Sequence, residues 1–252
     1  MKPRKQGFYQ ILVGLCFFAL GAFGFYWVHH SSSFALQDIE IDLPANPYIS
    51  KKQVLILSGA PLGQNLFRLD LRRIERQLEA HPWVARAFVS RRLPDGLYIK
   101  ITLEKPVAMV ATPKGVYLVN QQGRLFAPAL PLQMKDYPAL AGVSSQEIAA
   151  RSLDQRYRPL LKLLAYLRKH DQYLPCYANI SQIKLLKEGF VLLTRDAILV
   201  RFQGLDFATL WRQYRYLDRI MAYLYDTKQY SRAKVIRFDY PKGRAAISFK
   251  EG

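Results

Sequence analysis

The hydrophobic and polar positions of this chain form three patterns. The first is an apolar stretch without any charge. Tyr9 to Val28 is almost continuously apolar, and only basic charges, Lys2, Arg4 and Lys5, precede it. About 20 apolar residues in a helix, at ~1.5 Å per residue, cover the ~30 Å hydrocarbon core of a bilayer. Because positive charge tends to stay cytoplasmic, the pattern predicts a cytoplasmic tail over 1–8, a transmembrane helix over 9–28 and an exported remainder.

Two other interpretations of this apolar stretch are weaker. A cleaved signal peptide has a shorter apolar region of ~7–15 residues that ends in small residues. Here the stretch is longer and ends in Phe25, Tyr26 and Trp27, and aromatic rings suit the membrane–water boundary. A buried core helix seldom lacks charge over so many residues. The sequence therefore favours a membrane anchor.

A short polar linker, 29–33, leads into the second pattern, which predicts a small domain over 34–110. Residues 34–43 alternate between apolar and acidic positions, which is typical of a half-buried strand. Two helical patterns follow, capped by Ser50 and Asp70, and in the second of them we expect Glu79 to face water. Extended runs at 84–93 and 97–110 flank a Pro-Asp-Gly turn. The order is strand–helix–helix–strand–strand.

The third pattern predicts a larger domain over 111–252. A hairpin turn is predicted at residues 120–123, short strands follow at 180–186, 190–194 and 198–202, and two more strands, 234–240 and 245–249, close the chain. Helical spacing predicts one helix near 153–167, which Pro159 starts or kinks, and another after Asp206. The fold class is therefore α+β: an N-terminal transmembrane helix, a small β-α-α-β-β domain, and a larger, mostly antiparallel β domain with two helices.

The composition predicts a basic surface and excludes an intramolecular disulfide in the exported part. The predicted exported part holds 34 basic and 19 acidic residues, a formal charge of +15. Nucleic acid, anionic lipid and acidic proteins all suit such a surface, but export makes nucleic acid the least suitable partner. The plainer interpretation is that excess Lys and Arg solvate a surface beside an anionic membrane. Of the two cysteines, Cys16 lies in the predicted span, so Cys176 has no partner for an intramolecular disulfide outside it.

Catalytic chemistry has little support in the sequence. The four histidines do not stand at metal-ligand spacing, and no nucleophile, phosphate-loop or dinucleotide motif is present. Glu40 and Asp42 share a strand face and could pair as acid and base, but solvated strand carboxylates explain them better. We therefore predict no enzyme activity, no cofactor, no metal and no small-molecule substrate.

Binding surfaces remain, and the last strand is the main candidate. A strand at a sheet edge presents unpaired N–H and C=O groups that a partner's extended segment can pair with. In residues 245–249, Ile247 and Phe249 would point to one face, with Ala246, Ser248 and Lys250 on the other. The sequence leaves both an edge and an internal position open for this strand, with the edge slightly favoured.

The stretch PWVARAFVSRRLPDGLYIKI, which begins at Pro82, resembles the POTRA domain of the FtsQ/DivIB family of bacterial cell-division proteins. Asn65-Leu66-Phe67 before it, and Lys105-Pro106-Val107-Ala108 and the hairpin from Leu118 to Phe126 after it, fit as well. The layout of basic tail, single span, POTRA domain and β-rich domain covers essentially the whole chain. Departures lie near Glu104, at Asn120, where the family often has Asp, and at Arg237 and Asp239, whose charges are exchanged.

The resemblance implies a divisome scaffold. Proteins of this family sit in the cytoplasmic membrane at the septum, bind the bitopic proteins FtsB and FtsL, and help control septal peptidoglycan synthesis by FtsW and FtsI. Their POTRA domain is implicated in recruitment, with FtsK among the partners, and their C-terminal strand receives a strand of FtsB. Carried over by position, that partner site falls on four residues: Tyr240, Gly243, Ile247 and Phe249.

Two alternatives remain beside the scaffold. The chain could be a different membrane-anchored POTRA module that binds extended polypeptides as a chaperone does, or an unrecognised cell-wall enzyme. In the scaffold interpretation the tether is single-pass, the N-terminus is cytoplasmic, and residues 29–252 are periplasmic.

Overall fold

The structure is a computed structural model that describes residues 4–239 and 244–250, with side chains from Val13 onward. The chain divides into two compact units, Met1–Leu103 and Glu104–Gly252. The first unit begins with helix α1 (Arg4–His30), whose window Val13–His30 is long and apolar enough to cross a membrane. No side chain of that window is buried, as is expected of lipid-facing side chains, and only its last turn, through Trp27, His29 and His30, contacts Phe34, Phe67 and Arg68 among the described residues.

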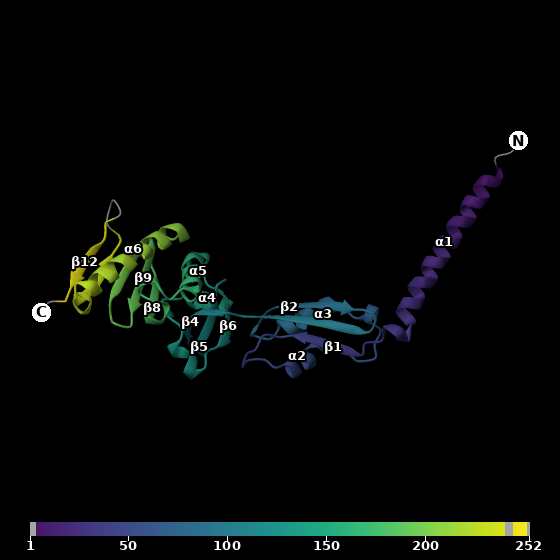
Figure 1. Ribbon diagram of the computed structural model, residues 1–252, viewed down its shortest axis with the longest axis horizontal. Helices are drawn as coiled ribbons and strands as arrows, with labels where there is room; N and C mark the ends of the chain where they lie inside the picture. The colour runs from purple at the N-terminus through teal and green to yellow at the C-terminus, as the bar shows by residue number, and fades with distance from the viewer. Residues whose placement is uncertain (1–3, 240–243, 251–252) are drawn as a thin grey trace. The chain divides into compact units, whose positions relative to one another are not determined.

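The remainder of the first unit is a three-stranded sheet with two helices against it (Figure 1). Its elements are β1 (Asp38–Asp42), α2 (Lys51–Ser58), α3 (Leu71–Glu79), β2 (Val84–Arg92) and β3 (Gly96–Leu103). The strand order is β1-β3-β2, with β1 parallel and β2 antiparallel to β3. This confirms the predicted β-α-α-β-β order, and Leu97, Ile99 and Ile101 supply buried side chains of the core, as their alternation predicted.

Local signals place the helices of this unit. Ser50 and Gln53 form the predicted capping box of α2, and Gly59 ends that helix in the left-handed region at φ 57°. Asp70 caps α3 by accepting from the Arg73 N–H. These caps satisfy backbone groups that a helix end otherwise leaves unpaired.

Glu79 departs from its predicted role, because its carboxylate does more than face water. It accepts a hydrogen bond from the Ala87 N–H at 3.1 Å, and Glu75, one turn earlier on α3, accepts from the Val89 N–H at 3.0 Å. Both donors belong to β2, which pairs with β3 alone. Two carboxylates of α3 therefore occupy outward N–H groups on this edge of the small sheet, where a partner strand would otherwise bond.

The second unit is built on a nine-stranded sheet in the order β12-β11-β10-β9-β8-β7-β4-β5-β6. Its strands are β4 (Pro106–Thr112), β5 (Gly115–Asn120), β6 (Leu125–Pro128), β7 (Ala139–Ala141), β8 (Ile180–Leu185), β9 (Gly189–Thr194), β10 (Leu199–Gln203), β11 (Ala233–Arg237) and β12 (Ala246–Phe249). Among the described residues, five strand pairs are antiparallel and three, β4–β7, β7–β8 and β10–β11, are parallel. The predicted mostly antiparallel α+β class is confirmed.

Helices α4 (Ser145–Ala150), α5 (Arg158–Leu167) and α6 (Phe207–Asp226) belong to the second unit. The sequence predicted α5 and α6 but not the six-residue α4. Helix α5 begins at Arg158, directly before Pro159, and Asp206 caps α6 as expected. One face of α6 is fully buried, through Leu210, Tyr214, Leu217, Met221 and Leu224.

One predicted element is divided. The extended run from Leu97 to Val110 forms two strands, β3 and β4, which belong to different sheets and different compact units. The units separate between Leu103 and Glu104. The domain limits 34–110 and 111–252 stay predictions, as do the limits of the tail, the span and the linker.

Candidate protein-binding surface

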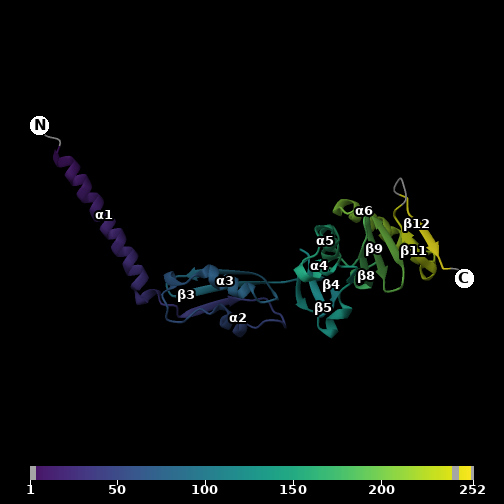
Figure 2. The ribbon, with the colours of Figure 1, turned by 180° about the vertical axis from the view of Figure 1, so that it is seen from behind.

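Strand β12 is the last strand at one end of the nine-stranded sheet and pairs with β11 alone (Figure 2). In its register Ser248 lies opposite Val235, Ile247 opposite Ile236, and Ala246 opposite Arg237. Of the two positions that the sequence left open, the structure has the edge. Within the described residues, no strand covers the far side of β12.

Two backbone hydrogen bonds determine which groups of β12 point outward. The Lys250 N–H donates to the Arg232 carbonyl at 2.7 Å, toward β11, and the Phe238 N–H donates to the Arg201 carbonyl at 2.9 Å, away from β12. Because backbone groups alternate sides along a strand, Ser248 and Ala246 also bond toward β11. The N–H and C=O groups of Ile247 and Phe249 therefore point away from the sheet, where a partner strand can pair with them.

The predicted site residues on β12 are accessible. Phe249 is 39% exposed and Ile247 is partly buried, and alternation along the strand puts both side chains on the same face. Tyr240 and Gly243 lie outside the described residues. The structure thus brings two of the four predicted residues together on one edge.

Charged groups beside this edge are paired within the chain. Asp239 accepts from Arg237 at 2.8 and 3.0 Å and lies 3.2 Å from the Arg201 Nε atom. The hydrogen bonds from Arg237, helped by the charges of both guanidinium groups, hold the pKa of the Asp239 carboxyl below its ordinary value. The exchanged charges at 237 and 239 therefore form an ion pair between near neighbours, with Arg201 of β10 as a third member.

The opposite end of the sheet is better covered. The Leu125 N–H of β6 donates to the Arg151 carbonyl at 3.0 Å, and the Leu153 N–H donates to the Gly123 carbonyl at 2.9 Å. Arg124 and Ser152 form an antiparallel bridge. Residues 151–153 therefore run beside the start of β6, so its backbone groups are less available there than those of β12.

Carboxylates on β1 have salt-bridge and hydrogen-bond partners rather than an acid–base arrangement. Glu40 pairs with Arg92, and Asp42 lies 3.6 Å from the Lys100 ammonium and accepts from the Tyr98 hydroxyl at 3.1 Å. Both carboxylates are exposed, as the strand pattern predicted. In the part of the chain that the structure describes, no three His, Cys, Asp or Glu side chains cluster in a way that could hold a metal ion.

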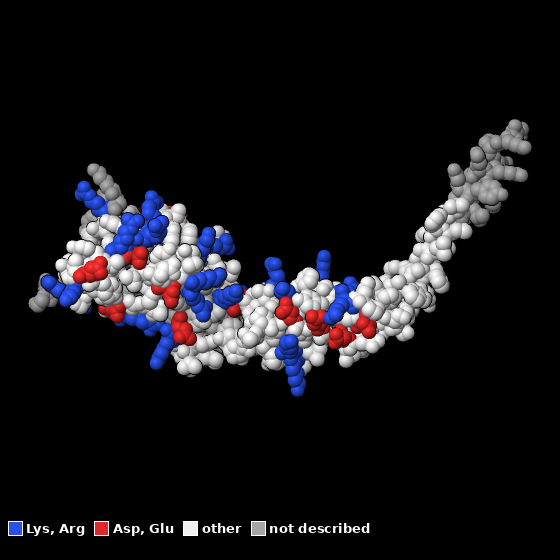
Figure 3. Space-filling model, in the orientation of Figure 1, with Lys and Arg blue, Asp and Glu red and all other residues white. Residues whose placement is uncertain are grey.

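Basic side chains dominate parts of the second unit's surface. Figure 3 shows Lys and Arg gathered over the region of α5 and α6 on the face turned to the viewer, with a few acidic groups between them. Arg212, Arg215 and Arg219 lie on the exposed side of α6, one turn apart. The excess positive charge of the sequence is thus a feature of the solvated surface.

An N-terminal apolar helix, a β-α-α-β-β domain and a larger sheet with an open C-terminal edge define a membrane-anchored POTRA protein. Residues 34–102 match the family model described as POTRA domain, FtsQ-type, and residues 108–239 match that of the FtsQ/DivIB C-terminal region of cell division proteins. The chain belongs to the FtsQ/DivIB family.

Curated relatives agree with this family. The chain is 27% identical over 229 residues to the cell division protein FtsQ of Koribacter versatilis, which covers 83% of this chain and 63% of that protein. It is 27% identical over 169 residues to FtsQ of Geotalea daltonii (66% and 54%) and 33% identical over 155 residues to FtsQ of Hahella chejuensis (62% and 48%). The matched part thus spans about half to two thirds of these relatives.

Proposed function

We propose that this protein is a bitopic scaffold of the bacterial divisome, which captures FtsB- and FtsL-type partners through β-augmentation at β12. The open edge of β12, with outward backbone groups at Ile247 and Phe249, carries the proposal. Membership of a cell-division family supplies the context. No chemistry on a small molecule enters the proposal, and it needs no cofactor.

Affinity and selectivity would come from different atoms of the same strand. Backbone hydrogen bonds to a partner strand give affinity that is independent of sequence, and alternate side chains give selectivity. Ile247 and Phe249 supply an apolar face for that selection, with Phe249 the more accessible of the two. We assign Tyr240 and Gly243 to the same site because the family resemblance places them there by position.

Helix α1 supports the proposed membrane topology. Its exposed apolar side chains, including Phe17 and Phe18, suit a lipid environment. The basic residues Lys2, Arg4 and Lys5 favour a cytoplasmic N-terminus. We therefore propose that residues 29–252 are periplasmic and that the protein acts at the division septum, where FtsW and FtsI make peptidoglycan. The POTRA domain would take part in recruitment there, with FtsK among its partners.

Proline scanning of β12 tests the site. Ile247→Pro removes an outward donor without breaking a bond to β11, and proline is tolerated on edge strands. A lost backbone bond at ~1 kcal/mol, plus the clash of the ring with an added strand, should weaken capture of an FtsB-type partner by roughly 10- to 100-fold. The measurement is titration of the full chain in detergent with the purified partner.

Side-chain variants and a matched control complete that experiment. Phe249→Ala and Tyr240→Glu should also weaken capture, whereas Lys234→Ala, an exposed position of β11, should not. Circular dichroism of each variant checks that the fold is kept. Wild-type affinity in both Ile247→Pro and Phe249→Ala would refute β12 as the partner site.

A groove beside β1 supports a second candidate function, that of a chaperone-like POTRA module. The β1 strand is the other edge of the POTRA sheet, and a groove of about 690 Å³ lies beside it, lined by residues that include Ile39, Lys52 and Leu55. Leu55 and Ile56 are exposed apolar side chains of α2. A chaperone-like POTRA module would bind extended polypeptides there, and crosslinks from Leu55 to unfolded outer-membrane proteins, with no division protein among the products, would favour it.

A further inference from the structure

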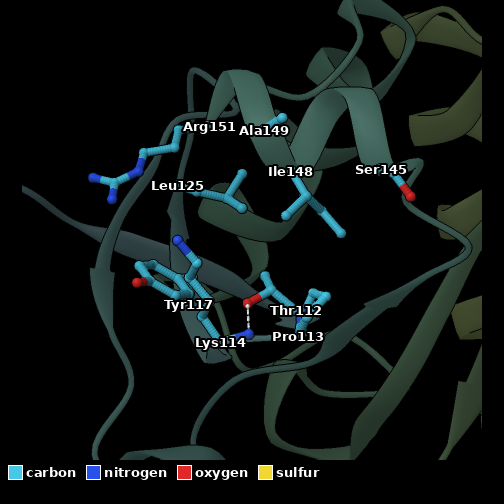
Figure 4. Close-up of a pocket in the computed structure, with 9 residues that line it drawn as sticks. All are labelled: Thr112, Pro113, Lys114, Tyr117, Leu125, Ser145, Ile148, Ala149 and Arg151. Atoms are coloured by element: carbon cyan, nitrogen blue, oxygen red, sulfur yellow. Dashed lines mark hydrogen bonds between the residues drawn. The ribbon is translucent and has the colours of Figure 1, made fainter.

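A cavity of about 470 Å³ lies in the second unit between α4, the β4–β5 turn and β6, away from the predicted partner residues (Figure 4). It is lined by Thr112, Pro113, Lys114, Tyr117, Leu125, Ser145, Ile148, Ala149 and Arg151. Its volume falls in the ~300–1,000 Å³ range of small-ligand pockets, which are mostly apolar with a few placed polar groups. The cavity therefore lies apart from the β12 edge, and it would bind a small group inside a pocket rather than a strand along a sheet edge.

The walls of this cavity are held by hydrogen bonds. Arg151 ends α4 in the left-handed region at φ 51°, its N–H donates to the Ile148 carbonyl at 3.2 Å, and its own carbonyl accepts from Leu125. On the other wall the Thr112 hydroxyl donates to the Gly115 carbonyl at 2.7 Å and accepts from the Lys114 N–H at 3.2 Å. A ligand would therefore meet a largely preformed site, which lowers the ordering cost of binding.

The interior is apolar and its charges are all positive. Leu125 is 2% exposed, and Figure 4 shows its side chain and that of Ile148, which projects from α4, across the cavity from Thr112 and Lys114, with the Tyr117 ring at one side. The Arg151 guanidinium carbon lies 5.9 Å from the centre of that ring. Lys114 and Arg151 are the only charged residues of the lining, and neither forms an ion pair with a residue that the structure describes.

We propose that this cavity binds a peptide segment in which a bulky apolar side chain stands next to a carboxylate. The apolar side chain would fill the space over Leu125 and Ile148, and the carboxylate would pair with Lys114 and Arg151. The hydroxyl of Ser145 adds a polar rim group for the amides of a peptide. A fatty acid carries the same carboxylate but no amide, so it is the competing occupant that the experiment must separate.

Methyl NMR of the full chain in detergent tests the proposal locally. The probe is the blocked dipeptide acetyl-Phe-Glu-amide, and the observed signals are the methyl groups of Leu125 and Ile148. We expect saturable shifts of both, weaker binding of acetyl-Phe-Gln-amide, and no competition from decanoate. Lys114→Gln and Arg151→Gln should each weaken binding of the Glu peptide by about fivefold, the effect of one partly exposed charge pair.

Two further variants separate binding from folding. Ala149→Phe fills the cavity from an exposed helical position and should abolish the shifts, whereas Lys169→Gln, an exposed lysine outside the lining, should change nothing. Equal binding of the Glu and Gln peptides, or affinity unchanged by Lys114→Gln and Arg151→Gln, would overturn the proposed recognition. Shifts caused by decanoate alone would overturn the peptide as occupant. Ile247→Pro should leave all of these results unchanged, because β12 does not line the cavity.

Discussion

Replacing Asn120 by Ala should destabilise the second unit more than any surface change nearby, because this side chain supports both a turn and a buried charge. Its Nδ2 donates to the Glu104 carboxylate at 2.9 Å, and its Oδ1 accepts from the N–H groups of Gln122 and Arg124 at 3.0 and 2.9 Å. Asn120 is 5% exposed and Glu104 is 8% exposed. The side chain therefore anchors the β5–β6 turn to a buried carboxylate.

The magnitude follows from these three bonds. A hydrogen bond to a charged group contributes about 1.5–3 kcal/mol, and each bond to a backbone N–H about 0.5–1.5 kcal/mol. The Arg124 Nη1 atom still lies 3.5 Å from the Glu104 carboxylate, and the turn's N–H groups gain access to water in the variant, so we take the lower part of the sum. The expected loss is about 3 kcal/mol, or roughly 6–12 °C in Tm for a unit of this size.

The assay is thermal unfolding of the full chain in detergent, followed by the fluorescence of Trp211, the one tryptophan of residues 104–252. Trp27→Phe and Trp83→Phe in the background isolate this signal. Gln121→Ala, an exposed neighbour in the same turn, is the matched control and should change the free energy of unfolding by less than about 0.5 kcal/mol. A loss below about 1 kcal/mol for Asn120→Ala would refute the reasoning.

Three other variants test separate parts of the fold. Leu97→Ala empties a fully buried position of the POTRA core and should cost about 2–5 kcal/mol in chemical denaturation, while an exposed change such as Arg86→Ala should not. Tyr177→Phe leaves the Val107 carbonyl without the hydroxyl that donates to it at 2.9 Å, and should cost about 1–3 kcal/mol. Partial burial raises the pKa of the Glu147 carboxyl, but the hydrogen bonds that it accepts from the Asp154 N–H and from Ser144 of the capping box outweigh this and hold that pKa below its ordinary value of 4.5. A lowered pKa in the folded state contributes stability that is complete above pH 4.5 and is lost as the pH falls through the folded value. Glu147→Gln should therefore destabilise at pH 7 and converge on the wild type in acid, and a difference that is independent of pH would contradict this.

Helix caps and strand alternation could be predicted from the sequence because they depend on residues that are neighbours in the chain. Ser50, Asp70 and Asp206 each start a helix where predicted, since a short polar side chain there accepts from a helix N–H nearby. The Pro-Asp-Gly turn likewise joins β2 to β3. Such features need no information about distant residues.

Long-range pairing set the limit of prediction. The sequence does not predict the division between β3 and β4, because apolar and polar residues alternate in both halves of residues 97–110. The two strands differ only in their partner strands. Helix α4 was missed although Ser144 and Glu147 form a capping box, because six residues carry too little helical periodicity. The role of Glu79 depends on β2, which follows it in the chain and whose N–H direction no pattern reveals.

In the candidate site, too, local features could be predicted and features that depend on distant residues could not. Alternation identified Ile247 and Phe249 as one face of the last strand, but their outward backbone direction required the bonds at Lys250 and Phe238. The cavity beside α4 was not predicted at all, since Lys114, Leu125 and Arg151 come from separate elements. A lone basic residue in a basic sequence gives no signal of such a site.

Strand β12 is four residues long and touches the sheet through β11 alone, which makes it a weak unit of local stability. Short edge elements open at little free-energy cost, and their amide protons exchange early. A captured strand would make β12 an internal strand, so partner binding and the local folding of the chain's last strands become linked equilibria. Their opening free energy should rise by RT ln(1 + [L]/Kd) as partner is added. Slowed amide exchange confined to β11 and β12 would then report partner concentration directly.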